Sequence, residues 1–281
     1  MSARLAYFGP PGTNAEEAAI KYSQAAGIDP ELVPIGSITG VGMSVESRDA
    51  DEAVMPIENS LEGAVAETLD FLVHTAKRTV IRDEVVLLID HYLLVKPGVR
   101  AEDVKVITSI PQALAQCRGY IDANFPKARI EAAMSTAAAV EAVMNRDDAA
   151  AIGNRRAADL YGAETLASQI QDRSPNHTRF VIVAPEDHEP TGDDRTSLAF
   201  AFANEDRPGQ LVAALQEFSS RGINLSKIES RPSKERLGTY IFLADLAGHR
   251  TDPELAEALA VVEGNCSAFH ILGSYPRYRG E

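Results

Sequence analysis

The chain has 281 residues, and its shares of hydrophobic (45%) and charged (24%) side chains are ordinary for a globular protein. At roughly 150 residues per domain, this length predicts about two domains. The 27 basic and 41 acidic side chains give a net charge of −14. That charge argues against nucleic acid or an anionic membrane as partner, because both need a positive surface. A small anionic substrate needs only a local positive site.

The cysteines and histidines predict neither a disulfide scaffold nor a metal site. Cys117 and Cys266 lie far apart and are too few for a cysteine-based zinc site, and the six histidines show no ligand spacing. No apolar run approaches the ~20 residues of a membrane helix, and no signal segment opens the chain. We therefore expect a cytoplasmic protein with reduced thiols.

In the first part of the chain, short apolar runs alternate with helical patterns. A strand over Leu5–Phe8 precedes a helix over Ala15–Ala26, and a strand over Glu52–Ile57 precedes a helix with one apolar face. The same alternation recurs at Val104–Thr108 with a helix from Pro111, and at Ala149–Gly153 with a helix from Asn154. It predicts parallel βαβ units. The strand-forming stretch Thr79–Val95 predicts a passage between two α/β lobes that enclose a cleft.

One segment divides the chain. Pro185–Arg195 reads PEDHEPTGDDR, with two prolines, one glycine and five acidic residues and no apolar period. We interpret it as a linker between a domain over residues 1–184 and a second domain over residues 196–281.

After the linker, the pattern predicts the order βαββαβ, which is the ferredoxin-like plan. The expected elements are a strand over Ser197–Ala203, a helix over Pro208–Arg221, strands over Ile223–Arg231 and Gly238–Leu246, a helix over Pro253–Glu263 and a strand over Ala268–Gly273. One sheet face must be covered by the two helices. The other face is expected to be solvated or paired with another chain.

Two polar segments follow strands in the first part. Tyr7–Asn14 is a Gly-rich turn into a helix, either an anion site on exposed backbone N–H groups or an ordinary turn capped by Thr13 or Asn14. Glu58, Asn59 and Ser60 come at the carboxyl end of a strand, where open α/β sheets bind ligands. They are read either as ligand-binding side chains or as a capping loop.

Three further segments have both a functional and a structural interpretation. Ser109 and Gln116 flank a helix start at Pro111, and Ser135-Thr136 opens another helix; each is a candidate donor, or simply a cap or solvated face. Asn176–Phe180 places a hydroxyl beside a guanidinium before a buried strand, which suits an anion with a leaving hydroxyl. The alternative is a hairpin turn.

Taken together, these segments resemble the prephenate dehydratase family with a C-terminal ACT domain. The matching motifs are YFGPPGT (Tyr7–Thr13), PIENSLEGAV (Pro56–Val65), PQALAQC (Pro111–Cys117), AAIGNRRAADLYG (Ala150–Gly162), IQD (Ile170–Asp172), NHTRF (Asn176–Phe180), EDRPGQL (Glu205–Leu211), GINL (Gly222–Leu225) and IESRP (Ile228–Pro232). The sequence has no room for a chorismate mutase domain before them, so we expect the monofunctional form. It implies a two-lobed catalytic domain like a type 2 periplasmic binding protein, with its active site in the cleft.

The resemblance implies decarboxylative dehydration of prephenate to phenylpyruvate, without metal or cofactor. Thr178 is the residue the family regards as essential, and we expect it to hydrogen-bond the leaving hydroxyl or to relay a proton. The other expected catalytic residues are Glu58, Asn59, Ser60 and Gln116. The expected substrate-binding residues are Thr13, Ser109, Ser135, Thr136, Arg179 and Phe180.

The resemblance also implies that L-phenylalanine binds the ACT domain at an interface of a homodimer or homotetramer. The expected effector-binding residues are Gly209, Gln210, Leu211, Asn224, Leu225, Glu229, Ser230, Arg231 and Pro232. Three positions depart from the family pattern. Asn14-Ala15 replaces Phe-Ser, Ile110 replaces the usual His, and Gln210 replaces Ala.

Two alternatives remain at this point. An arogenate dehydratase differs only in carrying an amine where prephenate has its side-chain keto group. A non-catalytic amino-acid sensor would keep the cleft and the ACT domain, but the presence of Thr178, Asn59 and Gln116 argues against it.

Overall fold

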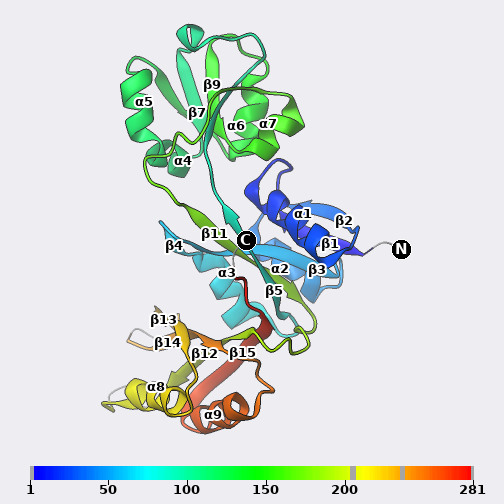
Figure 1. The fold of residues 1–281 in the computed structure, drawn as a ribbon, viewed down its shortest axis with the longest axis vertical. Helices are drawn as coiled ribbons and strands as arrows, with labels where there is room; N and C mark the ends of the chain where they lie inside the picture. Colours follow the sequence, from blue (N-terminus) through cyan, green and yellow to red (C-terminus); the bar gives the residue numbers. More distant parts are fainter. Residues whose placement is uncertain (1–2, 203–206, 235–237, 280–281) are drawn as a thin grey trace.

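The computed structural model describes residues 3–202, 207–234 and 238–279. Figure 1 shows three bodies stacked along the long axis: an outer α/β lobe, a central α/β lobe and a C-terminal α+β domain. Each body is built on its own sheet. None of the helices in these described ranges has the length and apolarity needed to cross a membrane.

The central lobe is formed by the N-terminal segment and one strand that returns from later in the chain. Its elements are β1 (Arg4–Phe8), α1 (Asn14–Ala26), β2 (Glu31–Ile35), α2 (Ile38–Glu46), β3 (Glu52–Asn59), β4 (Gly63–Ala64), α3 (Ala66–Asp70), η1 (Phe71–Thr75), β5 (Val80–Leu88) and β11 (His177–Ala184). The sheet order is β2-β1-β3-β11-β5, with β4 on β3. Strands β1 and β3 are parallel, as predicted, and β2, which the sequence did not predict, pairs parallel with β1. Strand β11 runs antiparallel between β3 and β5.

The outer lobe contains the middle of the chain. Its elements are β6 (Tyr92–Val95), η2 (Ala101–Asp103), β7 (Val106–Ser109), α4 (Pro111–Gln116), α5 (Arg118–Asn124), β8 (Arg129–Ala132), α6 (Thr136–Val143), β9 (Ala149–Gly153), α7 (Arg155–Tyr161) and β10 (Glu164–Ala167). The sheet order is β10-β6-β9-β7-β8. The two-lobed α/β architecture predicted from the sequence is confirmed.

The chain crosses between the lobes twice, after β5 and before β11. The crossing segments are joined by backbone hydrogen bonds from Ile89 N to Asn176 O (2.7 Å) and from Ile170 N to His91 O (3.1 Å). Thr79–Val95 therefore spans the passage that its composition predicted.

The C-terminal domain has the predicted βαββαβ order. Its elements are β12 (Asp194–Phe202), α8 (Gln210–Ser220), β13 (Leu225–Pro232), β14 (Tyr240–Ala247), α9 (Pro253–Glu263) and β15 (Cys266–Pro276). They form an antiparallel sheet in the order β13-β14-β12-β15. The predicted strand end at Ala203 and the first two residues of the motif Glu205–Leu211 lie outside the described residues.

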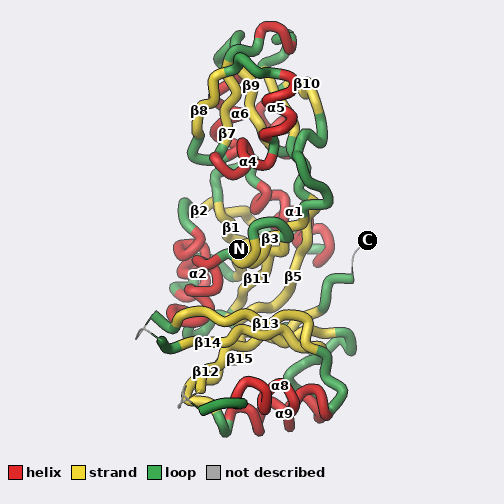
Figure 2. Tube along the Cα trace, turned by 90° about the vertical axis from the view of Figure 1, so that its left-hand side faces the viewer, coloured by secondary structure: helices red, strands yellow, loops and turns green. Residues whose placement is uncertain are grey.

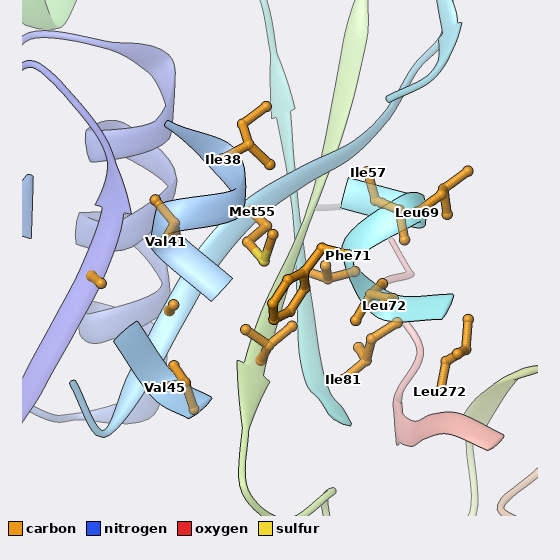
Figure 3. Close-up of a cluster of buried hydrophobic side chains, with 14 of the residues drawn as sticks. Ile38, Val41, Val45, Met55, Ile57, Leu69, Phe71, Leu72, Ile81 and Leu272 are labelled. Carbon is orange, nitrogen blue, oxygen red and sulfur yellow. The ribbon is translucent and has the colours of Figure 1, made fainter. Parts of the chain in front are cut away.

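The face of this sheet away from its helices packs on the central lobe. Figure 2 shows α8 and α9 on the far side of the sheet from that lobe. Leu243, Leu272 and Tyr275 belong to the same buried cluster as Leu72 and Ile81 of the central lobe, and Figure 3 shows Leu272 beside Ile81. The expectation of a solvated or partner-covered face is therefore wrong, because this chain's own central lobe covers it.

A glycine permits the close approach of the two sheets. Gly273 in β15 has φ 147°, and a Cβ there would overlap the backbone of Ile81 in β5. Only a residue without a side chain fits between these strands.

Candidate active site

A cavity of about 800 Å³ lies between the central and outer lobes. Seven of the expected catalytic and substrate-binding residues line it: Thr13, Asn59, Gln116, Ser135, Thr136, Thr178 and Phe180. Among the described residues that line this cavity there is no Asp, Glu, Lys or Arg, and His91 is the one with an imidazole.

Asn59 and Thr178 form the centre of the site on neighbouring strands, where they are register partners in β3 and β11. The side-chain oxygen Oδ1 of Asn59 accepts from the backbone N–H groups of Leu61 (2.9 Å) and Glu62 (3.0 Å). These two bonds fix the orientation of the side-chain amide. Its Nδ2 therefore donates to Thr178 Oγ1 (2.8 Å) and to Asn176 Oδ1 (2.8 Å). Since Thr178 accepts here, its own hydroxyl hydrogen can be donated into the cavity.

Gln116 reaches across the cleft from α4 of the outer lobe. Its Nε2 donates to Glu62 Oε1 of the central lobe at 3.0 Å. Its Oε1 lies 2.8 Å from His91 Nε2 and 3.4 Å from Asn176 Nδ2. The hydrogen bonds thus run without a break from Thr178 through Asn59, Asn176 and Gln116 to His91.

Two helix starts face the same cavity. Thr13 caps α1 by accepting from Glu16 N (3.4 Å), and Ser135 caps α6 by accepting from Ala138 N (2.9 Å). A helix start carries a partial positive charge and unpaired backbone N–H groups. The cavity can therefore attract an anion without a cationic side chain.

Sequence reasoning missed His91 and Asn176 as site residues. Both lie in the crossing segments between the lobes, and both join the network that ends at Thr178. An isolated His has no spacing partner in the sequence, so no pattern identified it. The signal available was its place inside the predicted passage between lobes.

Two expected site residues have structural roles instead. The Ser109 hydroxyl is fully buried and donates to Ile152 O at 2.7 Å, inside the outer lobe. Ser60 Oγ accepts from His177 N at 2.9 Å, which ties the two strand ends together. Neither residue is among those that line the cavity.

Glu58 and Arg179 also lie away from the cavity, contrary to our expectation for them. Side chains alternate between the two faces of a strand. Asn59 and Thr178 face the cavity, so their neighbours Glu58 and Arg179 face the C-terminal domain. There Arg179 Nη1 pairs with Asp245 Oδ2 at 2.8 Å, and Arg179 Nε lies 3.6 Å from Glu58 Oε2.

These two residues belong to a set of charges that we call the back-face cluster. Its members share the interface between the central lobe and the C-terminal domain: Glu58, Glu84, Arg179, Arg195, Lys227 and Asp245. Arg195 Nη1 lies 2.6 Å from Glu84 Oε2. Burial raises the pKa of Glu84, whereas for Asp245 the effect of burial is outweighed by Arg179 and a hydrogen bond from Ser197, so its pKa is lowered.

The expected effector-binding residues fall on two elements of the C-terminal domain. Gly209, in the left-handed conformation, precedes α8, which begins with Gln210 and Leu211. Asn224 and Leu225 lead into β13, where Glu229 and Ser230 and then Arg231 and Pro232 alternate between faces. Arg231 faces the central lobe, where it pairs with Asp70 (3.4 Å). Glu229 lies two residues away on the same face of β13 and pairs with Lys227 of that strand (3.6 Å).

Comparison with known proteins identifies relatives along nearly the whole chain. The family model of prephenate dehydratase matches residues 5–188, and that of the ACT domain matches residues 201–264. A prephenate dehydratase of Mycobacterium bovis is 40% identical over 282 residues, covering 97% of this chain and 87% of the relative.

Two solved structures share the fold over almost their full length. The prephenate dehydratase of Arthrobacter aurescens in complex with L-Phe is 37% identical, with a TM-score of 0.88 over 98% of this chain and 90% of that one. A protein described as a novel type of quorum quenching acylase is 29% identical, with a TM-score of 0.85 over 98% of each chain.

Proposed function

The chain belongs to the prephenate dehydratase family and carries a C-terminal ACT domain, and from this premise we propose how its cleft performs the reaction. The enzyme converts prephenate to phenylpyruvate in phenylalanine biosynthesis and is feedback-regulated by phenylalanine through the ACT domain. One proton is taken up, and carbon dioxide and water leave. The ring becomes aromatic, so the driving force lies in the substrate, and the difficulty is the departure of hydroxide.

Thr178 is the group that assists the leaving hydroxyl. The observation that carries this proposal is the direction of the Asn59–Thr178 hydrogen bond, in which Thr178 accepts. The hydroxyl hydrogen of Thr178 is then available to the departing oxygen of the substrate. The hydrogen bond from Thr178 to that oxygen strengthens as negative charge develops on the oxygen, and this lowers the barrier. Asn59 acts as a positioning residue, because its amide sets the direction of this hydrogen bond.

The two carboxylates of prephenate are held by dipoles rather than by cationic side chains. The starts of α1 and α6 supply backbone N–H groups, with the hydroxyls of Ser135 and Thr136 beside them. The Thr13 hydroxyl donates to Phe8 O at 3.1 Å, so Thr13 acts here through the helix start that it caps. Phe180 supplies apolar surface for the ring. Gln116 supplies an amide N–H from the opposite lobe, so closure of the lobes brings the donors together.

Glu58, Ser60, Ser109 and Arg179 have no direct contact with substrate in this proposal. Their side chains support the strands and the interface with the ACT domain. The same proposal includes a catalytic domain over residues 1–184, a linker over residues 185–195 and an ACT domain over residues 196–281. It also includes a cytoplasmic location.

Phenylalanine binds near the start of α8 and along β13, as expected from the sequence, in a homodimer or homotetramer. The support is the ACT domain together with the relative from Arthrobacter aurescens that was solved with L-Phe. The carboxylate of the effector would meet the N–H groups at Gly209 and Gln210.

The test is formation of phenylpyruvate from prephenate by the purified protein, with arogenate assayed in parallel. A higher kcat/KM on arogenate would make the protein an arogenate dehydratase. No product from either substrate, with phenylalanine still bound, would favour the amino-acid sensor. Because the same fold occurs in a protein described as a quorum quenching acylase, the purified protein is also assayed for acylase activity, which we expect to be absent.

A further inference from the structure

The orientation of the Gln116 carboxamide is determined by its neighbours. The carboxylate of Glu62 can only accept, so the Gln116 atom that faces it at 3.0 Å is the amino nitrogen Nε2. The oxygen Oε1 therefore faces His91 Nε2 at 2.8 Å. Because that oxygen can only accept, His91 must carry its hydrogen on Nε2.

The His91 imidazole is suited to this role because it is neutral and fixed in place. The side chain is buried, and burial lowers its pKa. The polar side chains around it are Gln116 from α4, Gln171 from the second crossing and its own neighbour Asp90. Gln171 Oε1 accepts from His91 N at 3.0 Å, and Gln171 Nε2 donates to Asp90 at 2.7 Å.

Among the residues that the structure describes, Gln116 has no other strong partner on its side-chain oxygen. The bond from Asn176 Nδ2 is long, at 3.4 Å. Without the His91 hydrogen, the carboxamide could rotate and withdraw its amino group from the cavity and from Glu62. The fixed imidazole, together with the solvent-exposed carboxylate of Glu62, therefore decides which end of Gln116 the substrate meets.

We infer that His91 is a positioning residue of the dehydratase site, holding Gln116 with its amino group toward substrate. This inference rests on the proposed function of the cleft. The crossing segment between the lobes thereby contributes to the geometry of the active site, because His91 lies in it and orients Gln116.

The experiment is a double-mutant cycle of His91→Leu and Gln116→Ala, measured as kcat and KM for prephenate. Loss of a residue that orients a metal ligand typically costs about 10–100-fold in activity, and we expect a loss of kcat of similar size in His91→Leu, where the oriented group is the Gln116 amide. In the Gln116→Ala background, the same substitution should cost less than about 2-fold, because the residue it positions is gone. A full and additive loss in that background would overturn the inference.

Two amide variants distinguish positioning from packing. His91→Gln places an N–H near the position of Nε2 and should recover most of the activity, whereas His91→Asn is too short to reach Gln116 and should not. Equal activities of these two variants would also overturn the inference, and both remain informative if the Leu variant fails to fold. His177→Gln, at an exposed His next to the site, is the matched control and should match wild type.

The failure of this inference differs from failure of the proposed function. An active wild-type protein with normal His91 variants would contradict only the role of His91. A wild-type protein that forms no phenylpyruvate would contradict the function itself.

Discussion

At the scale of single residues, two backbone N–H groups set the direction of the hydrogen bond between Asn59 and Thr178. Leu61 and Glu62 donate to the oxygen of Asn59, so its amino group must face Thr178. The turn at Leu61 and Glu62 thereby makes the Thr178 hydroxyl an acceptor toward Asn59, which leaves its hydrogen to be donated into the cavity. This dependence can be tested separately from the presence of the hydroxyl.

Replacing Thr178 by Ala should lower kcat by at least ~10²-fold, the usual size of a lost acid–base or leaving-group interaction. Thr178→Ser keeps the hydroxyl and should keep substantial activity. Steady-state kinetics on prephenate measure both. Near-normal kcat in the Ala variant would remove Thr178 from the mechanism.

Asn59→Asp should be nearly as damaging as loss of Thr178. The carboxylate can still accept from Leu61 and Glu62, so the turn is kept, but it cannot donate to Thr178. The Thr178 hydrogen would then point to the new carboxylate rather than to substrate, and kcat should fall by ~10²-fold or more. Asn59→Asp combined with Thr178→Ala should be little worse than either alone, and additive losses would contradict this account.

The site residues that sequence could identify were those at strand ends and helix starts. Thr178, Asn59 and Gln116 come from such positions and from family motifs, and the structure brings them together. Arg179 and Glu58 were assigned to the same site because they are adjacent in sequence. Strand alternation sends them to the opposite face, so that once Thr178 is placed, its neighbour must point away.

At the scale of elements, most strands and helices of the core could be predicted, because buried runs carry a clear period. The predicted helix after Glu52–Ile57 is divided in the structure into α3 and the π-helical turn η1. Strands β2 and β8 were missed because they have few buried residues. The position of β11 between β3 and β5 was not predictable, since it depends on a return from the outer lobe.

Gly273→Ala should weaken the packing of the ACT domain on the central lobe. The added methyl group would overlap the Ile81 backbone, and the φ of 147° is unfavourable for Ala. Such overpacking typically costs about 1–3 kcal/mol of unfolding free energy, which urea denaturation would measure. Gly264→Ala is the control: it has φ −61° and no atom within 3.5 Å of the new methyl group, so stability should be unchanged or slightly higher.

At the scale of the whole molecule, the two catalytic lobes are bridged by polar contacts at the rim of the cavity. Arg156 of α7 pairs with Glu16 of α1 at 2.9 Å, and Asn154 Nδ2 donates to Asn14 Oδ1 at 2.6 Å. The Glu16 side chain is only 8% exposed. These contacts favour the arrangement in which donors from both lobes face one cavity.

Glu16→Gln should raise KM more than it lowers kcat, because it weakens closure and leaves Thr178 intact. Burial raises the pKa of Glu16, but Arg156 and the Gly12 N–H outweigh this, so the pKa is lowered in sum. The stabilisation is thus present above the unfolded pKa of about 4.3 and is lost as pH falls through the folded value. Wild type should be more stable than the variant at pH 7, with the difference vanishing in acid.

The control for Glu16→Gln is the same change at an exposed pair. Glu102 pairs with Arg100 at 2.7 Å within the outer lobe, and both side chains are largely exposed. Glu102→Gln should change stability by less than about 1 kcal/mol and leave KM unchanged. Equal effects at both positions would mean that Glu16 does not act by joining the lobes.

The core shared by the ACT sheet and the central lobe has a consequence for how feedback control can be lost. A chain ending at Ala184 would expose Ile81 and Leu72 to water and would remove Asp245 and Arg195, the partners that the C-terminal domain supplies to Arg179 and Glu84. Leaving a formerly buried Leu or Ile side chain in water typically costs about 1.5–3 kcal/mol. Truncation after Ala184 should therefore give an unstable protein rather than an active enzyme that phenylalanine no longer inhibits. An enzyme insensitive to phenylalanine should instead arise through single substitutions that leave this core intact.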